Sequence, residues 1–123
     1  MTVIGDDRQQ LGRAGEQLAC EHFQRLGFDI VERNYRTRWG ELDVIAFDGR
    51  TLVFCEVKTR RAGGAPLDAI HGNKQGRVRK MAVSWLVERT DRPHADDLRF
   101  DAIAVIFDHD GGLLSLEHLE AAF

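Results

Sequence analysis

The chain has 123 residues, which is enough for one hydrophobic core and too few for two ordinary domains, so we expect a single domain spanning 1–123. Its net charge of −3 argues against a protein that coats nucleic acid indiscriminately. No apolar run approaches the roughly 20 residues of a membrane span, and residues 1–7 lack the basic and apolar regions of a signal peptide. We therefore expect a cytoplasmic protein without a membrane partner.

The N-terminal half is predicted to form a helix followed by three strands. Apolar residues recur at helical spacing from Leu11 to Leu26, which predicts the helix. Residues alternate from Phe28 to Asn34, as expected for a short strand. Residues 39–47 and 51–59 predict a hairpin across the turn dipeptide Asp48-Gly49.

The C-terminal half adds a second helix and one or two strands. We expect Arg60 to Pro66 to form a flexible connection, and Asn73 to cap a helix that runs to about Arg89. Residues 100–107 form an apolar run of strand length, and 113–117 predict a last strand. Because the longest strand runs are continuously apolar, we expect strands covered on both faces, in one sheet with helices packed against it.

The spacing of cysteines and histidines predicts no zinc site. Cys20 and Cys55 have neither a C-x-x-C spacing nor a suitable neighbouring histidine, so we expect both to be reduced and at least partly buried. His22 lies within the apolar stripe of the first helix, which favours a core or boundary position. The sequence contains no P-loop, nucleophile elbow or dinucleotide fingerprint.

Three charged residues interrupt the apolar strands of the predicted hairpin, where an unpaired buried charge is costly: Asp43, Glu56 and Lys58. A two-residue or a four-residue turn places all three on one face, whereas a three-residue turn without a bulge would separate them. Paired carboxylates repel unless a proton or cation lies between them, and Mg²⁺ takes one or two carboxylates together with phosphate and water. Two interpretations follow. Either Asp43 and Glu56 hold a metal while Lys58 orients water and stabilises charge on a phosphate, or Lys58 neutralises a salt-bridge cluster.

Two further glutamates lie near this hairpin or on the first helix. Glu16 is at the edge of the helix's apolar stripe, and alone it would be interpreted as a solvated residue. Glu41 shares a strand face with Asp43, so it either joins the site or lies at the exposed end of the strand.

The middle of the chain is basic, which gives a net-negative protein one side able to face phosphate. The candidate substrate contacts there are Lys74, Arg60 and Arg77. Lys74 extends the apolar stripe of the second helix, so it either snorkels along the sheet or reaches a phosphate. Arg77, Arg79 and Lys80 taken individually are typical of solvent-exposed charges.

Four motifs together resemble the YraN-like family of bacterial proteins, over about Leu11 to Val105. They are Gly12-Arg13-Ala14-Gly15-Glu16, Arg33-Asn34-Tyr35-Arg36, Gly40-Glu41-Leu42-Asp43 and Glu56-Val57-Lys58-Thr59-Arg60. The constellation of Asp43 with Glu56-Val57-Lys58 also resembles the PD-(D/E)-x-K nuclease superfamily, although Leu42 stands where the superfamily's nominal proline precedes the aspartate. This resemblance implies an α/β, restriction-endonuclease-like fold: a mixed central β-sheet flanked by two main helices.

The pattern is also similar to the archaeal Holliday junction resolvases, in which a first-helix glutamate, a strand aspartate and a Glu-Val-Lys motif form the active site. The catalytic residues implied here are Glu16, Asp43, Glu56 and Lys58. Mg²⁺ or Mn²⁺ would bind Asp43 and Glu56, Glu16 would assist through a water or a second metal, and Lys58 would act at the nucleophile.

The implied function is a divalent-metal-dependent nuclease that hydrolyses DNA phosphodiesters, on branched or junction DNA in repair or recombination. A resolvase making paired cuts would be a symmetric homodimer, for which Trp39 or Leu119 to Phe123 are candidate contacts. One alternative is a catalytically silent module that keeps the nuclease fold and binds nucleic acid or protein. Another is a structural interaction protein with an incidental charge cluster.

Overall fold

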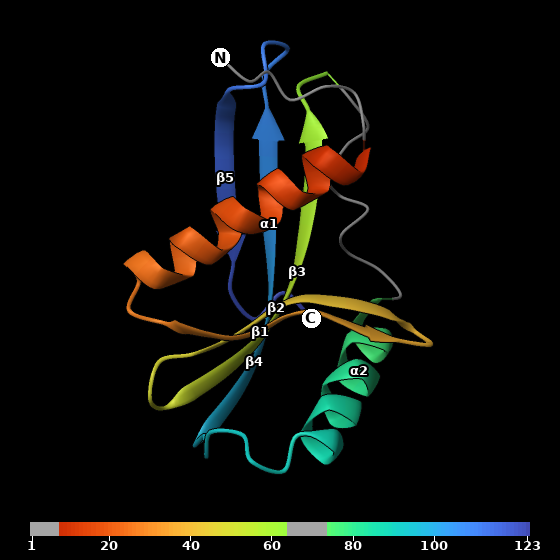
Figure 1. Ribbon diagram of the computed structural model, residues 1–123, viewed down its shortest axis with the longest axis vertical. Helices are drawn as coiled ribbons and strands as arrows, with labels where there is room; N and C mark the ends of the chain where they lie inside the picture. Colours follow the sequence, from red (N-terminus) through yellow and green to blue (C-terminus); the bar gives the residue numbers. More distant parts are fainter. Residues whose placement is uncertain (1–7, 64–73) are drawn as a thin grey trace.

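The computed structural model of the protein describes residues 8–63 and 74–123, in which two helices pack on a five-stranded sheet (Figure 1). The elements are α1 (Arg8–Arg25), β1 (Asp29–Thr37), β2 (Gly40–Phe47), β3 (Thr51–Arg61), α2 (Lys74–Glu88), β4 (Asp97–Phe107) and β5 (Leu113–Leu119). The strands follow the order β1-β2-β3-β4-β5, with β3 and β4 parallel and the other neighbours antiparallel. The predicted α/β fold, a mixed sheet flanked by two helices, is confirmed.

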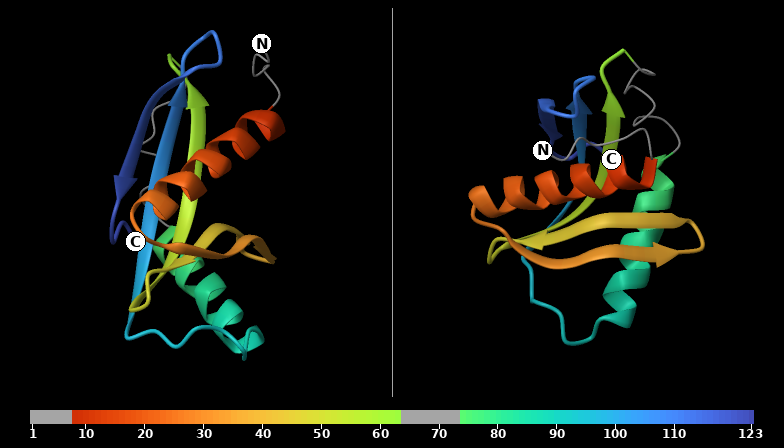
Figure 2. Two further views of the ribbon diagram at one scale, coloured as in Figure 1. Left: turned by 60° about the vertical axis from the view of Figure 1, so that its left-hand side comes forward. Right: turned by 45° about the horizontal axis from the view of Figure 1, so that its top comes forward.

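The sheet is strongly twisted, so the β1–β2 hairpin crosses the direction of β3, β4 and β5 (Figure 1). Seen from the side, this hairpin lies between α1 and α2 (Figure 2). Neither helix within the described residues is long and apolar enough to cross a membrane.

Each face of the sheet carries its own buried apolar layer. The α1 layer joins Ala19, Cys20 and Phe23 of the helix to Val53 and Cys55 of β3. The α2 layer is built on Trp85, which is 1% exposed, and on its neighbours Val78, Met81, Leu52 and Phe54. Because neighbouring residues of β3 enter opposite layers, the central strands are covered on both faces, as their apolar runs predict.

Several predicted strand boundaries need correction: β4 begins at Asp97 and not at residue 100, β5 continues to Leu119, and two other strands are longer than predicted. β1 continues to Thr37, since Arg36 and Thr37 pair with Glu41 and Gly40 of β2. β3 continues to Arg61, since Arg60 and Arg61 pair in parallel with Ile106 and Phe107 of β4, so Arg60 belongs to a strand and not to a flexible connection. The rest of that predicted connection, from Gly64 to Pro66, and the predicted cap Asn73 lie outside the described residues.

The burial of individual side chains bears on several of the predictions. Cys20 and Cys55 are free thiols and both are buried, as expected. Phe123 is only 7% exposed, and its carbonyl accepts a hydrogen bond from Arg79 of α2, so this end of the chain is packed against the protein. Trp39 is half-buried at the edge of the α2 layer.

The β2–β3 hairpin adopts the register of a four-residue turn. Phe47 pairs with Leu52, and the ladder continues to Val44 and Cys55. The Asp48 carboxylate fixes this turn by accepting hydrogen bonds from the backbone amides of Arg50 (2.9 Å) and Thr51 (2.7 Å). The four-residue turn is one of the two predicted registers, but the paired ladder ends at Val44 and Cys55, so the predicted pairing of Asp43 with Glu56 is not formed.

Strand alternation breaks beside the predicted site. Leu42 and Val44 would share a face in a regular strand, yet Leu42 packs in the α2 layer and Val44 in the α1 layer. The neighbouring residue of β1 is Asn34, whose backbone has a φ of 56°, a left-handed conformation that asparagine tolerates. Arg33 and Tyr35, on either side of Asn34, are both paired with residues of β2. The change of face in β2 therefore occurs opposite Asn34.

Candidate functional site

Asp43 lies where β2 and β3 separate. The paired ladder ends at Val44 and Cys55, and beyond it the Asp43 carboxylate accepts a 2.7 Å hydrogen bond from the backbone amide of Val57. The residue is only 9% exposed. A carboxylate held this way is fixed by the backbone of the next strand, so its orientation is set by the fold.

Three carboxylates form a group, which we call the Asp43 cluster: Glu16 from α1, and Glu41 and Asp43 from β2. Each offers an oxygen, and these oxygens all lie within 4.8 Å of one another. Carboxylate oxygens are the ligands that hard divalent cations prefer. The cluster is thus a group of side chains able to hold a metal ion.

The electrostatics of the Asp43 cluster favour a cation or a proton. The pKa of Asp43 is raised to about 7, chiefly by burial; the charges of Glu16, Glu41 and Glu56 contribute to the increase, and the hydrogen bond from the Val57 amide opposes it. Burial also raises the pKa of Glu16, with Glu41 adding to the effect. A divalent cation at this position would reverse the sign of the local field and keep both carboxyls ionised.

Asn34 connects two members of the cluster, and its role was not inferred from sequence. With its amide nitrogen turned toward the carboxylates, it donates to Glu16 (2.7 Å) and to Glu41 (2.8 Å). Arg36 makes a 3.2 Å ion pair with Glu41. Asn34 belongs to one of the motifs quoted above, but that motif did not predict its left-handed backbone.

Glu56 and Lys58 form a second group beside the first, which we call the Glu56 group. Glu56 is 6% exposed and accepts a 2.9 Å hydrogen bond from Arg77 of α2, while the Lys58 ammonium lies 3.8 Å from the same carboxylate oxygen. The Arg77 side chain runs past Gly40, where an added Cβ would lie 3.7 Å from it. Glu56 is close enough to Asp43 to raise the pKa of that residue, so the two groups adjoin.

Two hollows flank Glu16, and both have basic walls. One, of about 430 Å³, lies between α1 and the end of β3 and includes Arg60 and Arg61. The other, of about 550 Å³, lies between α1 and the β1–β2 hairpin and includes Arg13 and Arg36. The carboxylates of the Asp43 cluster are therefore approached from both sides past guanidinium groups, which suit a phosphate ligand.

Residues 15–105 match the uncharacterised protein family UPF0102. The chain belongs to this family. It is 44% identical to a UPF0102 protein of Acidothermus cellulolyticus over the full length of both chains. It is also 44% identical to one of Parafrankia sp., with 94% of this chain and 97% of the relative covered, and 42% identical to one of Geotalea daltonii, with 96% and 92% covered. The predicted YraN-like membership is confirmed, and the matched range contains the Asp43 cluster and the Glu56 group.

The structure places the sequence-predicted residues in different surroundings. Glu16 and Asp43 meet in one cluster, and Glu41, whose role the sequence left open, joins them. Glu56 and Lys58 meet in the adjoining group, and Glu56 is outside the cluster of three.

The three predicted substrate contacts also lie in different surroundings. Arg77 is bound to Glu56, so it is part of the site's own ion pairing and not a solvent charge. Arg60 lines the hollow beside Glu16, and its guanidinium donates to the carbonyl of Arg61. Lys74 begins α2, and its side chain lies outside the described part of the structure.

Gly15 sets the approach of α1 to the sheet next to Glu16. A Cβ added at Gly15 would lie 2.1 Å from the Thr59 hydroxyl oxygen and 3.0 Å from its methyl group, both on β3. No other residue type leaves this space, so the helix contacts β3 directly one residue before Glu16. The close approach helps bring the Glu16 carboxylate within reach of a strand carboxylate.

Proposed function

We propose that this protein is a divalent-metal-dependent nuclease of the PD-(D/E)-x-K type, with a restriction-endonuclease-like fold, acting on DNA. The observation that carries the proposal is the buried Asp43 carboxylate, which is grouped with Glu16 and Glu41 and lies beside Glu56 and Lys58. A fold keeps mutually repelling buried carboxylates at a cost in stability, and a cation that binds them during function explains that arrangement.

Mg²⁺ or Mn²⁺ would be held by Asp43 with Glu16 and Glu41, and Glu56 is the further candidate ligand that the superfamily resemblance implies. When bound, the metal would supply Lewis-acid activation of a phosphodiester and of the attacking water. Side chains of the protein would position the phosphate and stabilise the charge that builds on it. Asp43, fixed by the Val57 amide, would set the position of the reacting phosphate, and the Lys58 ammonium would donate to the charge that builds on it.

The basic walls of the two hollows support a polyanionic substrate. Arg13 and Arg36 flank Glu16 on the hairpin side, and Arg60 and Arg61 flank it on the β3 side. A DNA strand crossing the cluster would meet guanidinium groups before and after the scissile phosphate, which would neutralise its charge and orient it.

The proposal is tested by incubating junction, flap, linear and single-stranded DNA with the protein in Mg²⁺ or Mn²⁺. The wild type should cleave at least one substrate, and Asp43→Asn and Lys58→Ala should each lower the rate by about 100-fold or more. Asp29→Asn is the matched control, because Asp29 is an exposed aspartate at the start of β1, and it should cleave at the wild-type rate. Intact DNA in every wild-type reaction would contradict the proposal.

One observation favours the alternative of a catalytically silent binding module. Glu56 is already paired with Arg77 and lies 3.8 Å from Lys58, so its charge is offset within the protein. Under this alternative, DNA would bind equally well to the wild type, to Asp43→Asn and to Lys58→Ala, and no variant would cleave it.

A further inference from the structure

An apolar hollow of about 490 Å³ lies on the outer side of α2, beside the tip of the β1–β2 hairpin. Its floor is made by Val83 and Val87, which are 59% and 71% exposed, and one wall is Trp39, from the turn that joins β1 to β2. Large apolar side chains exposed together around an aromatic ring are typical of a surface that binds a ligand.

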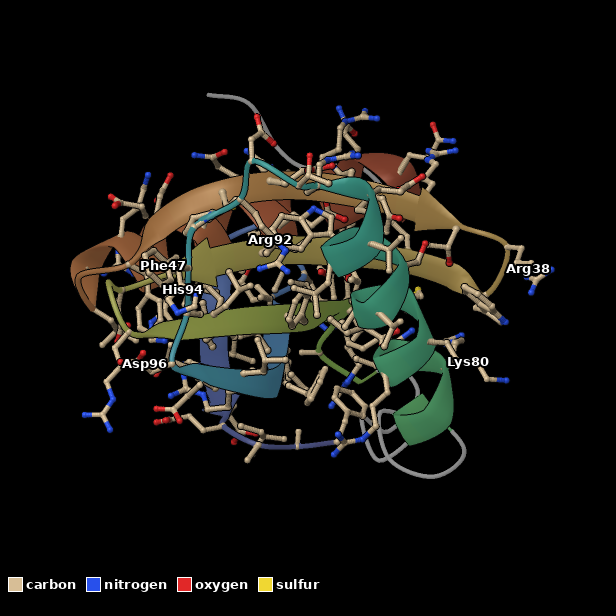
Figure 3. All side chains as sticks on the ribbon, turned by 90° about the horizontal axis from the view of Figure 1, so that it is seen from below. Arg38, Phe47, Lys80, Arg92, His94 and Asp96 are labelled. Carbon is tan, nitrogen blue, oxygen red and sulfur yellow. The ribbon has the colours of Figure 1, made fainter. Side chains whose placement is uncertain are left out.

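The rim of this hollow, which we call the Trp39 groove, is positively charged. Arg79 and Lys80 line it, and the Arg38 guanidinium lies 4.6 Å from the centre of the Trp39 ring. Figure 3 shows Arg38 at the hairpin tip and Lys80 on α2, both projecting away from the protein. The acidic residue of the groove, Glu88, accepts a hydrogen bond from the Tyr35 hydroxyl and lies 3.8 Å from Arg89, so its charge is offset.

The Trp39 groove adjoins the Glu56 group of the candidate site, because the Arg77 side chain that binds Glu56 passes Gly40, the residue after Trp39. Arg77, which binds Glu56 and runs past Gly40, precedes Lys80 by three residues, so the two cations lie on one side of α2. Trp39 and Asp43 are four residues apart along the hairpin, which corresponds to about 13 Å of extended strand. A DNA strand with one phosphate at the candidate site would therefore have a base within a few nucleotides of it near Trp39.

We infer that the Trp39 groove binds an unpaired base of a DNA strand, so that the substrate is DNA with a single-stranded segment next to the cleaved phosphate. This inference rests on the proposed function. An apolar hollow beside an indole accepts the face of a base, while the cations at its rim accept the flanking phosphates. Fully paired duplex exposes no base face, so the groove distinguishes flapped or branched DNA from linear duplex.

The inference is tested by DNA binding in metal-free buffer, where cleavage does not interfere. Trp39 is the reporter, because the other tryptophan, Trp85, is 1% exposed and contributes a constant background. We expect oligothymidylate and flap DNA to quench the wild-type fluorescence, and blunt duplex to leave it unchanged. By anisotropy with labelled flap DNA, Trp39→Ala should bind about tenfold or more weakly, whereas Trp39→Phe, which keeps a ring, should retain most of the affinity.

Leu114→Ala is the matched control, because Leu114 is 58% exposed on β5, at the opposite edge of the sheet from β1, and it should bind like the wild type. Thermal unfolding of Trp39→Ala and Trp39→Phe shows whether either variant has lost its fold. Equal affinity of the wild type and a folded Trp39→Ala for flap DNA would overturn the inference.

Two other results would also overturn it. If Trp39→Ala converts a dimer into a monomer in sedimentation experiments, the groove is a contact between copies of the chain. If oligouridylate binds as tightly as oligothymidylate, the assignment to DNA is wrong. Because all these measurements are of binding without metal, a failure of the cleavage experiment leaves them unaffected, and the two claims fail separately.

Discussion

Two buried aspartates on neighbouring parts of the sheet differ in almost everything but their burial. Asp43 is 9% exposed and Asp101 is fully buried. Burial alone would raise the pKa of Asp101, but hydrogen bonds from His118, from Arg99 and from the backbone amide of Ala121 hold the pKa of that carboxyl below its ordinary value. At Asp43 the pKa is raised to about 7, and the charged groups that act on it are carboxylates.

The difference separates a charge that the fold compensates from one that it leaves beside other carboxylates. Asp101 accepts a 2.7 Å hydrogen bond from His118 and paired hydrogen bonds from Arg99, so the fold itself supplies the compensating charge. His118 in turn lies 3.0 Å from His22 of α1, which extends the network to the helix. Asp43 accepts a hydrogen bond from a backbone amide, while the neighbouring carboxylates of Glu16, Glu41 and Glu56 raise its pKa. We interpret Asp43 as a group whose compensation comes from outside the protein.

A large effect on stability is expected from removing each charge in turn. Asp101→Asn should lower the free energy of unfolding by about 3 kcal/mol, because it leaves Arg99 and His118 without their carboxylate. Asp43→Asn should leave the stability of the metal-free protein unchanged or raise it, because it removes a repelled charge. Urea unfolding of the two variants measures this contrast. Equal losses in both would show that Asp43 is as well compensated as Asp101.

The two aspartates should also give opposite dependences of stability on pH. Between pH 3.8 and about 7 the unfolded chain releases the Asp43 proton while the folded protein retains it, so the free energy of unfolding should fall as pH rises, by up to about 4 kcal/mol. At Asp101 the pKa is lower in the folded protein than in the unfolded chain. The stability that the ionised Asp101 carboxylate contributes is therefore present above pH 3.8 and is lost as pH falls further.

Urea unfolding of the metal-free protein from pH 4 to 8 checks the Asp43 part of this prediction. Asp43→Asn is the control, and its stability should fall less over that range than the wild type's. Parallel profiles for the wild type and Asp43→Asn would mean that Asp43 is already ionised in the folded protein across this range.

A smaller effect on stability is expected from a substitution at Gly15, because α1 packs beside the surroundings of both Asp43 and Asp101. Gly15→Ala drives a methyl group against Thr59 next to Glu16, which should cost about 1–3 kcal/mol and weaken the response to Mg²⁺. Gly12→Ala is the matched control on the same helix. An added Cβ there meets nothing within 4 Å, so this variant should be stabilised by about 0.5–1 kcal/mol. Equal effects at the two glycines would remove the argument for close helix approach.

The sequence predicts a feature well when the residues that determine it lie close together along the chain. The β2–β3 register follows from Asp48, whose side chain closes the turn, and from the apolar runs on either side. The five-stranded order with a parallel β3–β4 pair is not local, and neither is the extension of β3 to Arg61, which depends on pairing with β4. Glu16 was predicted from the family resemblance, since its helical position alone is that of a solvated residue.

The features that sequence reasoning missed arise from backbone conformation and tertiary contacts. Regular alternation predicts Asp43, Glu56 and Lys58 on one face, but the left-handed backbone of Asn34 accompanies a change of face at Asp43. Arg77 was interpreted as a solvent charge, and only the packing of α2 brings it to Glu56. Asp101 lies in an apolar run, and its partners come from positions that no spacing rule connects.

The central claim is that the Asp43 cluster binds a divalent cation that compensates its charge. The most direct test is an NMR titration of the Asp43 carboxyl carbon, with and without saturating Mg²⁺, assigned by comparison with Asp43→Asn. We predict a pKa of about 7 without metal and a clear decrease when Mg²⁺ is added, while the Asp101 carboxyl titrates below its ordinary value in both conditions. A pKa of Asp43 that Mg²⁺ leaves unchanged would contradict the account.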